Sequence, residues 1–321
     1  MLARVKAAVV SSFDTPPQLG KFAPPVAEAD EALVEVKATA LTQLVRAQAA
    51  GKHYSGATPP LVPGADGVGL WQGQRVYFAF PRAPVGSMAE CTAVKRAYLV
   101  PVPAELDDVT AAAAGNPGMA SWAGLTRRAA FKAGESVLVN GAAGTSGRLA
   151  IQVAKHLGAR RVVATARDRS TESALRALGA DAFIALDQPA AELTAAFRAE
   201  LAGEGVDVVL DYLFGAPAEA FVAATIGRAS GRAEPRIRFV QVGSAAGLNL
   251  ALPGAALRSS GLELLGTGLG AVSNQELLAC ISELFRVYAT AGFLVETRAL
   301  PLDSVATAWQ SGGSARTVFT L

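Results

Sequence analysis

Short apolar or alternating segments, separated by proline and glycine, make up most of the first hundred residues. Such segments are typical of short strands joined by loops. The predicted strands cover residues 5–10, 31–40, 67–70, 74–80 and 88–94. Only residues 42–50 have the spacing of a helix. This part of the chain is therefore expected to form a compact, loop-rich and mostly β domain.

From about residue 104 the pattern changes to buried strands that alternate with helices. Apolar runs of about five residues between helices indicate a parallel sheet covered on both faces. The predicted strands are 136–140, 161–166, 182–185, 206–210, 238–242 and 262–266, and the predicted helices are 109–114, 119–131, 148–157, 171–178, 190–201 and 218–225. The tail is expected to be helical over 274–292 and strand-like over 296–321, with a final strand at 318–321.

Length and composition narrow the class of protein. The chain has 321 residues, 51% of them hydrophobic, and its 29 basic and 27 acidic side chains give a net charge of +2. This length favours two domains, and the hydrophobicity excludes a disordered chain. Without a basic run or an unbroken apolar span, we expect neither a nucleic-acid partner nor a membrane segment. The first residues lack a signal-peptide pattern, so a soluble, cytoplasmic protein is expected.

A glycine-rich turn links the predicted strand at 136–140 to the following helix. It reads Ala142, Ala143, Gly144, Thr145, Ser146 and Gly147. Backbone N–H groups and the helix dipole attract a pyrophosphate at such a helix N-terminus, and the absent side chains let the phosphates approach. Because a strand precedes the turn and further strand–helix units follow it, the turn predicts a dinucleotide-binding site.

The end of the next predicted strand bears on which dinucleotide binds. NAD sites place an acidic residue about 20 residues beyond the loop. Here Thr165 and Ala166 end the strand, and two arginines, Arg167 and Arg169, flank Asp168. The small residue and the arginines favour the 2′-phosphate of NADP, with ordinary solvated arginines as the alternative. Asp168 is either the expected acid in a displaced position or a cap of the next turn.

Several motifs together carry a family resemblance. They are the helical segment 38–51, the turn Pro63–Gly69, the strand Gly73–Tyr77, the loop at 142–147 and the late turns at 240–243 and 266–270. In these motifs the sequence resembles the zinc-independent quinone oxidoreductase branch of the medium-chain dehydrogenase/reductase superfamily, over essentially its whole length. The resemblance implies an α/β fold with a discontinuous, mostly β GroES-like catalytic domain at 1–113 and 268–321. It also implies a Rossmann NADP-binding domain with a doubly wound parallel sheet at 114–267, an NADPH cofactor, and a homodimer joined through the last Rossmann strand.

The resemblance and the arguments from the loop and the strand ends together give a set of candidate cofactor-binding residues. They are Asn116, Ala143, Gly144, Thr145, Ser146, Gly147, Thr165, Ala166, Arg167, Arg169, Tyr212, Val242, Gly243, Gly268, Leu269 and Gly270. Tyr212 follows a predicted strand at the edge where open α/β sheets bind ligands, with simple sheet packing as the alternative. We expect Arg258 and Arg316 to be surface charges, with an approach to the substrate or to phosphate as the alternative.

Departures from the family bear on the chemistry. Zinc-dependent members of the superfamily have a histidine where Ala65 stands, a cysteine near position 40 and a lobe with four cysteines, whereas this chain has only Cys91 and Cys280. No metal is therefore expected. Quinone reductases of the branch have a polar pair, Asn and Asp, at the positions of Thr42 and Val45. In this sequence only the hydroxyl of Thr42 remains of that pair.

The function predicted from these residues is NADPH-dependent transfer of a hydride to a quinone or an α,β-unsaturated carbonyl compound. The expected partner is thus a small electrophilic molecule. Tyr54 resembles in position a tyrosine that lines the substrate cleft of related reductases, and a phenol there can donate to the acceptor carbonyl. The alternative for Tyr54 is packing over the cleft mouth. Thr42 is the second catalytic candidate. The alternative functions are an enoyl-thioester reductase and a non-catalytic NADPH-binding sensor or structural protein.

Overall fold

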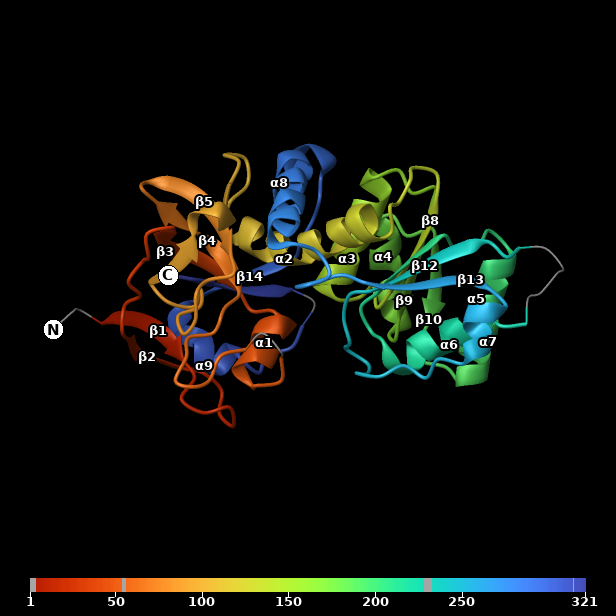
Figure 1. Ribbon diagram of the computed structural model, residues 1–321, viewed down its shortest axis with the longest axis horizontal. Helices are drawn as coiled ribbons and strands as arrows, with labels where there is room; N and C mark the ends of the chain where they lie inside the picture. Colours follow the sequence, from red (N-terminus) through yellow and green to blue (C-terminus); the bar gives the residue numbers. More distant parts are fainter. Residues whose placement is uncertain (1–3, 54–55, 228–232, 314) are drawn as a thin grey trace. The chain divides into compact units, whose positions relative to one another are not determined.

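The computed structural model describes residues 4–53, 56–227, 233–313 and 315–321, which belong to two compact units (Figure 1). Unit 1 combines the chain up to Asn116 with Asn274–Leu321, and unit 2 is Pro117–Ser273. The domain boundaries expected from the sequence, after residues 113 and 267, lie a few residues before these positions. The first boundary falls inside the helix α2 (Asp108–Ala123).

Unit 2 is built on a six-stranded parallel sheet. Its strands are β8 (Ser136–Asn140), β9 (Arg161–Ala166), β10 (Ala182–Ala185), β11 (Val208–Asp211), β12 (Arg236–Gln241) and β13 (Gly261–Gly266). They lie in the order β10-β9-β8-β11-β12-β13. The strand order therefore reverses between β8 and β11, as in a doubly wound Rossmann sheet, where ligands bind beside the carboxyl ends of the strands at the reversal point. This confirms the predicted fold class.

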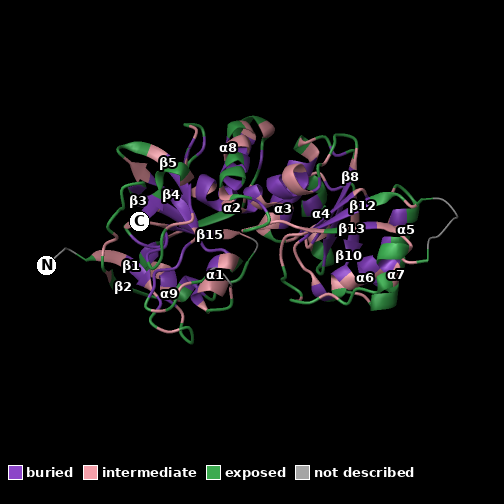
Figure 2. Ribbon diagram, in the orientation of Figure 1, coloured by how far each residue is buried: buried purple, intermediate pink, exposed green. Residues whose placement is uncertain are grey.

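Helices cover both faces of this sheet. They are α3 (Thr145–His156), α4 (Glu172–Ala177), α5 (Ala190–Ala202), α6 (Gly215–Thr225), α7 (Gly254–Arg258) and a π-helical segment that continues α2 (Gly124–Arg128). On one face, α5 and α6 pack against β12 through Phe197, Phe221 and Phe239, whose ring centroids lie 5.4 and 5.8 Å apart. On the other face, Gly124 packs so closely that an added Cβ would lie 3.0 Å from the Leu210 side chain. Every residue of β8 is buried, as its apolar run predicts (Figure 2).

Unit 1 is mostly antiparallel β structure. Its strands are β1 (Val5–Val9), β2 (Gln18–Phe22), β3 (Glu31–Ala40), β4 (Asp66–Trp71), β5 (Gln74–Ala79), β6 (Cys91–Lys95), β7 (Leu99–Pro101), β14 (Thr297–Pro301) and β15 (Arg316–Thr320). β1 pairs with β2, while a larger sheet has the order β14-β15-β3-β4-β5-β7 and β6 also pairs with β3. The described helices of this unit besides α2 are α1 (Gln43–Ala49), α8 (Asn274–Ala291) and α9 (Val305–Ala308).

The structure differs from the sequence prediction in short elements. The prediction of strand-like structure throughout 296–321 was wrong, because Val305–Ala308 forms the helix α9 between β14 and β15. The strands β2 and β7 were not predicted. Most residues of β2 are exposed, so it lacks the alternation that reveals a half-buried strand, and β7 has only three residues.

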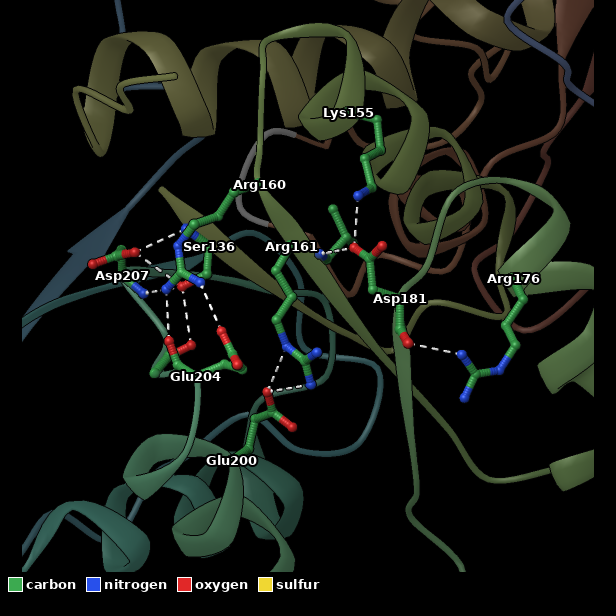
Figure 3. A network of polar contacts seen from close by, with 11 residues as sticks. Ser136, Lys155, Arg160, Arg161, Arg176, Asp181, Glu200, Glu204 and Asp207 are labelled. Atoms are coloured by element: carbon green, nitrogen blue, oxygen red, sulfur yellow. Dashed lines mark hydrogen bonds and ion pairs between the residues drawn. The ribbon is translucent and has the colours of Figure 1, made fainter. Parts of the chain in front are cut away.

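Polar side chains form a network at the amino ends of the strands of unit 2 (Figure 3). Arg161 at the start of β9 pairs with Glu200 at 2.8 Å, and Lys155 near the end of α3 pairs with Asp181 at 2.6 Å. Asp207, just before β11, accepts hydrogen bonds from the backbone N–H and hydroxyl of Ser136 at 2.8 and 2.9 Å. This edge lies opposite the carboxyl ends where the candidate site is found.

Candidate functional site

The glycine-rich loop leaves the carboxyl end of β8 and enters the N-terminus of α3. Gly144 is the N-cap residue, in an extended conformation, and has no side chain that could cap the helix. The first N–H groups of an α-helix lack intrahelical partners and form the positive end of the helix dipole. The amides of Thr145 and Ser146 are thus presented as donors for an anion.

Glycine is needed in this loop for two different spatial reasons. A Cβ on Gly147 would lie 2.5 Å from both the Cα of Ala142 and the carbonyl oxygen of Gly141, so α3 approaches the loop backbone too closely for any side chain. A Cβ on Gly144 would meet no atom of the described residues within 4 Å. The open space beside Gly144 and the uncapped amides fit the pyrophosphate of a dinucleotide.

A buried hydrogen-bonded network lies beneath the loop. The Asn140 amide donates to Oδ1 of Asp211 at 2.7 Å, and the Thr165 hydroxyl donates to Oδ1 of Asn140 at 2.7 Å. The Gly141 N–H donates to Oγ1 of Thr165 at 3.0 Å. The network joins the last residues of β8 and β11 to Thr165 near the end of β9. Asn140 and Asp211 were not among the predicted site residues, although a polar residue ending each of two apolar strands was a usable signal.

The end of β9 is the place where the sequence predicts binding of a 2′-phosphate. Thr165 and Ala166 are buried, whereas Arg167 and Arg169 are exposed, and within the described chain neither guanidinium has an intramolecular hydrogen bond or ion pair. Asp168 accepts a hydrogen bond from the Ser170 N–H at 2.8 Å, which lowers the pKa of its carboxyl. Its alternative as a turn cap is therefore confirmed.

The remaining candidates of unit 2 follow β11, β12 and β13. The N–H groups of Val242 and Gly243 donate to the carbonyl oxygen of Asp211 at 2.7 and 3.0 Å. The Tyr212 hydroxyl is buried and has no hydrogen-bond partner among the described residues, and burial raises its pKa. Positive φ angles of 138° and 91° at Gly268 and Gly270 shape the turn that contains Leu269. The loops after five strands of one sheet thus border one edge of unit 2.

Three predicted residues lie outside unit 2. Thr42 is buried and is the N-cap of α1, where its Oγ1 accepts from the Val45 N–H at 3.1 Å. A hydroxyl that accepts still has its own proton to donate. Asn116 is partly buried, at the last position of unit 1 before the boundary inside α2. Tyr54 lies outside the described residues.

Unit 1 contains a buried polar cluster that the sequence did not predict. Tyr77 donates to Oδ2 of Asp66 at 2.6 Å, while Oδ1 of Asp66 is buried and has no partner in the part of the chain that the structure describes. Burial raises the pKa of the Asp66 carboxyl to about 6, against the opposing effects of the Tyr77 hydrogen bond and the Arg316 charge. Arg316 is partly buried and donates to the Leu41 carbonyl at 3.3 Å. Its prediction as a surface charge was wrong, whereas Arg258 is exposed as expected.

The described residues provide neither a metal cluster nor a membrane-spanning helix. Across 4–53, 56–227, 233–313 and 315–321, no group of three or more His, Cys, Asp or Glu side chains is placed to hold a metal ion. In the same part of the chain, no helix combines the length and apolar character that crossing a membrane requires.

The chain is similar to several known dehydrogenases and reductases. The model of the zinc-binding dehydrogenases matches residues 147–283, a stretch that excludes Ala65 and the region near position 40. A probable NADPH-dependent quinone reductase of Emericella nidulans is 28% identical, over 86% of this chain and 88% of that protein. The chloroplastic NADPH-dependent alkenal/one oxidoreductase of Arabidopsis thaliana is 37% identical, but over only 49% of this chain and 45% of that protein.

A solved structure extends the similarity to the whole fold. The quinone oxidoreductase of Thermus thermophilus, solved also in complex with NADPH, is 25% identical with a TM-score of 0.80, over 98% of this chain and 100% of that one. The chain also has a Rossmann unit between the two parts of a mostly β unit. These similarities support a quinone oxidoreductase-like protein of the medium-chain dehydrogenase/reductase superfamily.

Proposed function

We propose that the protein is an NADPH-dependent, zinc-free reductase that transfers a hydride to a quinone or an α,β-unsaturated carbonyl compound. The observation that carries this proposal is the anion cradle at the N-terminus of α3, where Gly144 leaves open space in front of uncapped amides. The similarity to an NADPH-dependent quinone reductase and an NADPH-dependent alkenal/one oxidoreductase supports the same reaction class.

In this proposal unit 2 is the cofactor-binding domain. Residues 143–147 hold the pyrophosphate, and Arg167 and Arg169 pair with the 2′-phosphate. The loops around Tyr212, 242–243 and 268–270 border the rest of the cofactor. Bound NADPH supplies the hydride, while the chain binds and orients the cofactor.

Unit 1 is the catalytic domain in the same proposal. As a hydride reaches the acceptor, negative charge develops on its carbonyl oxygen, and a hydrogen-bond donor there stabilises the transition state. Tyr54 is proposed as this donor. Thr42 is a second donor, because its Oγ1 accepts from Val45 and its proton remains available.

The proposed reaction is tested by following NADPH oxidation with a panel of quinones, α,β-unsaturated ketones, an enoyl thioester and simple alcohol–aldehyde pairs. We expect turnover with quinones or unsaturated carbonyls and little with the alcohol–aldehyde pairs. Tyr54→Phe should lower kcat without changing NADPH affinity, because the phenol acts on the acceptor. Selective turnover of the enoyl thioester would replace the proposal by an enoyl-thioester reductase. Tight NADPH binding without any turnover would favour a sensor.

The 2′-phosphate site makes a separate prediction about cofactor choice. Arg167→Ala should weaken NADPH binding and leave NADH binding nearly unchanged, since only NADPH carries the phosphate that the guanidinium pairs with. Fluorescence titration of both cofactors measures the effect, and Arg258→Ala, an exposed arginine on α7, is the control. Equal affinity of the wild-type protein for NADPH and NADH would contradict the prediction.

A homodimer is also part of the proposal. β13 is an edge strand of its sheet, and an unpaired edge tends to associate with another chain. Leu248, Leu257 and Leu264, on or near this edge, are 83%, 49% and 37% exposed. Pairing with a second copy would cover the edge and these side chains in an isologous dimer. A monomer in light scattering at micromolar concentration would count against it.

Zinc independence and a cytoplasmic location complete the proposal. The Ala65 side chain has no atom that can ligate a metal, and Cys91 and Cys280 are the only cysteines of the chain. Elemental analysis that finds one zinc per chain would refute zinc independence, and fractionation of cells tests the location.

A further inference from the structure

Asp211 connects several loops at the carboxyl edge of the unit 2 sheet. Its carboxylate accepts from the Asn140 amide at 2.7 Å and from the N–H groups of Leu213 and Phe214 at 3.2 and 3.0 Å. Phe214 has a φ of 55°, a strained value for a residue with a side chain. Asp211 therefore holds the turn after β11 and reaches across to the end of β8.

The ionised carboxylate of Asp211 determines which group donates in the hydrogen bonds that lead from it through Asn140 and Thr165 to Gly141. Burial raises the pKa of Asp211 to about 6, so at pH 7.5 the group is mainly ionised and can only accept. The Asn140 side chain must then present its NH₂ group to Asp211 and its oxygen to the Thr165 hydroxyl, 2.7 Å away. Since that hydroxyl gives its proton to Asn140, its lone pair is left to accept from Gly141.

The last donor in this series of hydrogen bonds is the N–H of Gly141, which directly follows β8 and leads into the glycine-rich loop. Gly141 has a φ of 89°, and its N–H donates to Oγ1 of Thr165 at 3.0 Å. The next amide, of Ala142, donates to the Thr165 carbonyl at 2.7 Å. Two successive amides of the loop are thus attached to Thr165, and the Thr165 hydroxyl is oriented from Asp211.

We propose that Asp211 is a positioning residue for the cofactor, which acts through Asn140 and Thr165 to hold the glycine-rich loop in its anion-binding conformation. This inference rests on the proposed function, in which the loop binds the pyrophosphate of NADPH. Asp211 does not touch the pyrophosphate in this role. It orients the backbone that does.

The matched pair Asp211→Asn and Asp207→Asn tests this role. Both aspartates accept hydrogen bonds from β8, Asp207 at the amino edge through Ser136 and Asp211 at the carboxyl edge through Asn140. An asparagine at either position has one acceptor oxygen and adds two donors. Both variants should therefore lower the melting temperature, but only Asp211→Asn should disturb the glycine-rich loop.

For Asp211→Asn we expect the Kd for NADPH to rise about tenfold, equivalent to about 1.4 kcal/mol, while kcat at saturating NADPH stays close to that of the wild type. For Asp207→Asn we expect an unchanged Kd. Fluorescence titration gives the Kd, and steady-state kinetics separates the KM for NADPH from kcat. Equal Kd values for both variants would overturn the inference and leave Asp211 a structural residue.

A second pair keeps the test valid if Asp211→Asn does not fold. Thr165→Val removes the hydroxyl at nearly constant shape and should raise the Kd for NADPH, whereas Thr165→Ser keeps the hydroxyl and should restore most of the affinity. Equal Kd values for the two threonine variants would also overturn the inference. Failure of the proposed function is distinguishable, because the wild-type protein itself would then not bind NADPH.

Discussion

Replacing Gly147 by alanine should abolish measurable cofactor binding and destabilise unit 2. The new Cβ would stand 2.5 Å from the Cα of Ala142 and from the carbonyl oxygen of Gly141, both of them backbone atoms of the loop. No side chain can rotate away to make room, so the N-terminus of α3 must move relative to the loop. Overpacking of this kind costs about 1–3 kcal/mol. The shift also moves the amides at the start of α3 away from the pyrophosphate position.

Gly144→Ala is the matched control for this prediction. Gly144 has a φ of −75° and a ψ of 163°, which alanine adopts freely, and within the described chain its Cβ would meet no atom within 4 Å. The melting temperature of Gly144→Ala should stay near that of the wild type, while NADPH binding weakens because the methyl group occupies the space left for the pyrophosphate. Calorimetry and fluorescence titration separate the two effects. Normal NADPH binding by Gly147→Ala would contradict the assignment of the loop.

Replacing Asp66 by asparagine should stabilise the protein at neutral pH and not in acid. The pKa of Asp66 is raised from 3.8 to about 6, so the folded state binds more protons than the unfolded state between these values. Stability from this group is therefore fully present below pH 3.8 and is lost as the pH rises to about 6. The shift corresponds to about 3 kcal/mol that the neutral amide avoids. Asparagine can still accept the hydrogen bond from Tyr77.

The pH dependence is the decisive measurement for Asp66→Asn. Denaturant unfolding at pH 7.5 should show a higher free energy of unfolding for the variant, and the advantage should shrink as the pH falls below about 6. Asp168→Asn provides a control of opposite sign. The pKa of the exposed Asp168 carboxyl is lowered by its hydrogen bonds with Ser170, so its contribution is present at neutral pH and is lost in acid. A stabilisation of Asp66→Asn that does not change with pH would refute the explanation.

The sequence predicted the Rossmann sheet well because each buried parallel strand leaves a continuous apolar run. The predicted ranges 136–140, 161–166 and 182–185 coincide with β8, β9 and β10. The GroES-like part was harder, since an exposed strand such as β2 has no such run and α9 is a single turn.

The candidate site was predicted where the signal is local in the chain. The glycine-rich loop and the arginines after β9 are contiguous motifs, so the sequence could reveal them. The hydrogen bonds among Asn140, Thr165 and Asp211 join strands that become neighbours only in the folded sheet. In its register, Asp211 lies beside Asn140. Arg316 was taken for a surface charge because its contact with Leu41 spans most of the chain.

The ion-pair network at the amino edge of the unit 2 sheet offers a route for engineering the protein. Pairs such as Arg161 with Glu200 and Lys155 with Asp181 belong to the strand starts and helix ends, whereas the glycine-rich loop leaves the opposite strand ends. Variants with substitutions only at the amino edge can therefore be screened for heat resistance while the residues proposed to bind the cofactor stay unchanged. Networks of ion pairs contribute relatively more to stability at high temperature, where the cost of desolvating charges falls. This edge is accordingly the place to begin adapting the enzyme to hot process conditions.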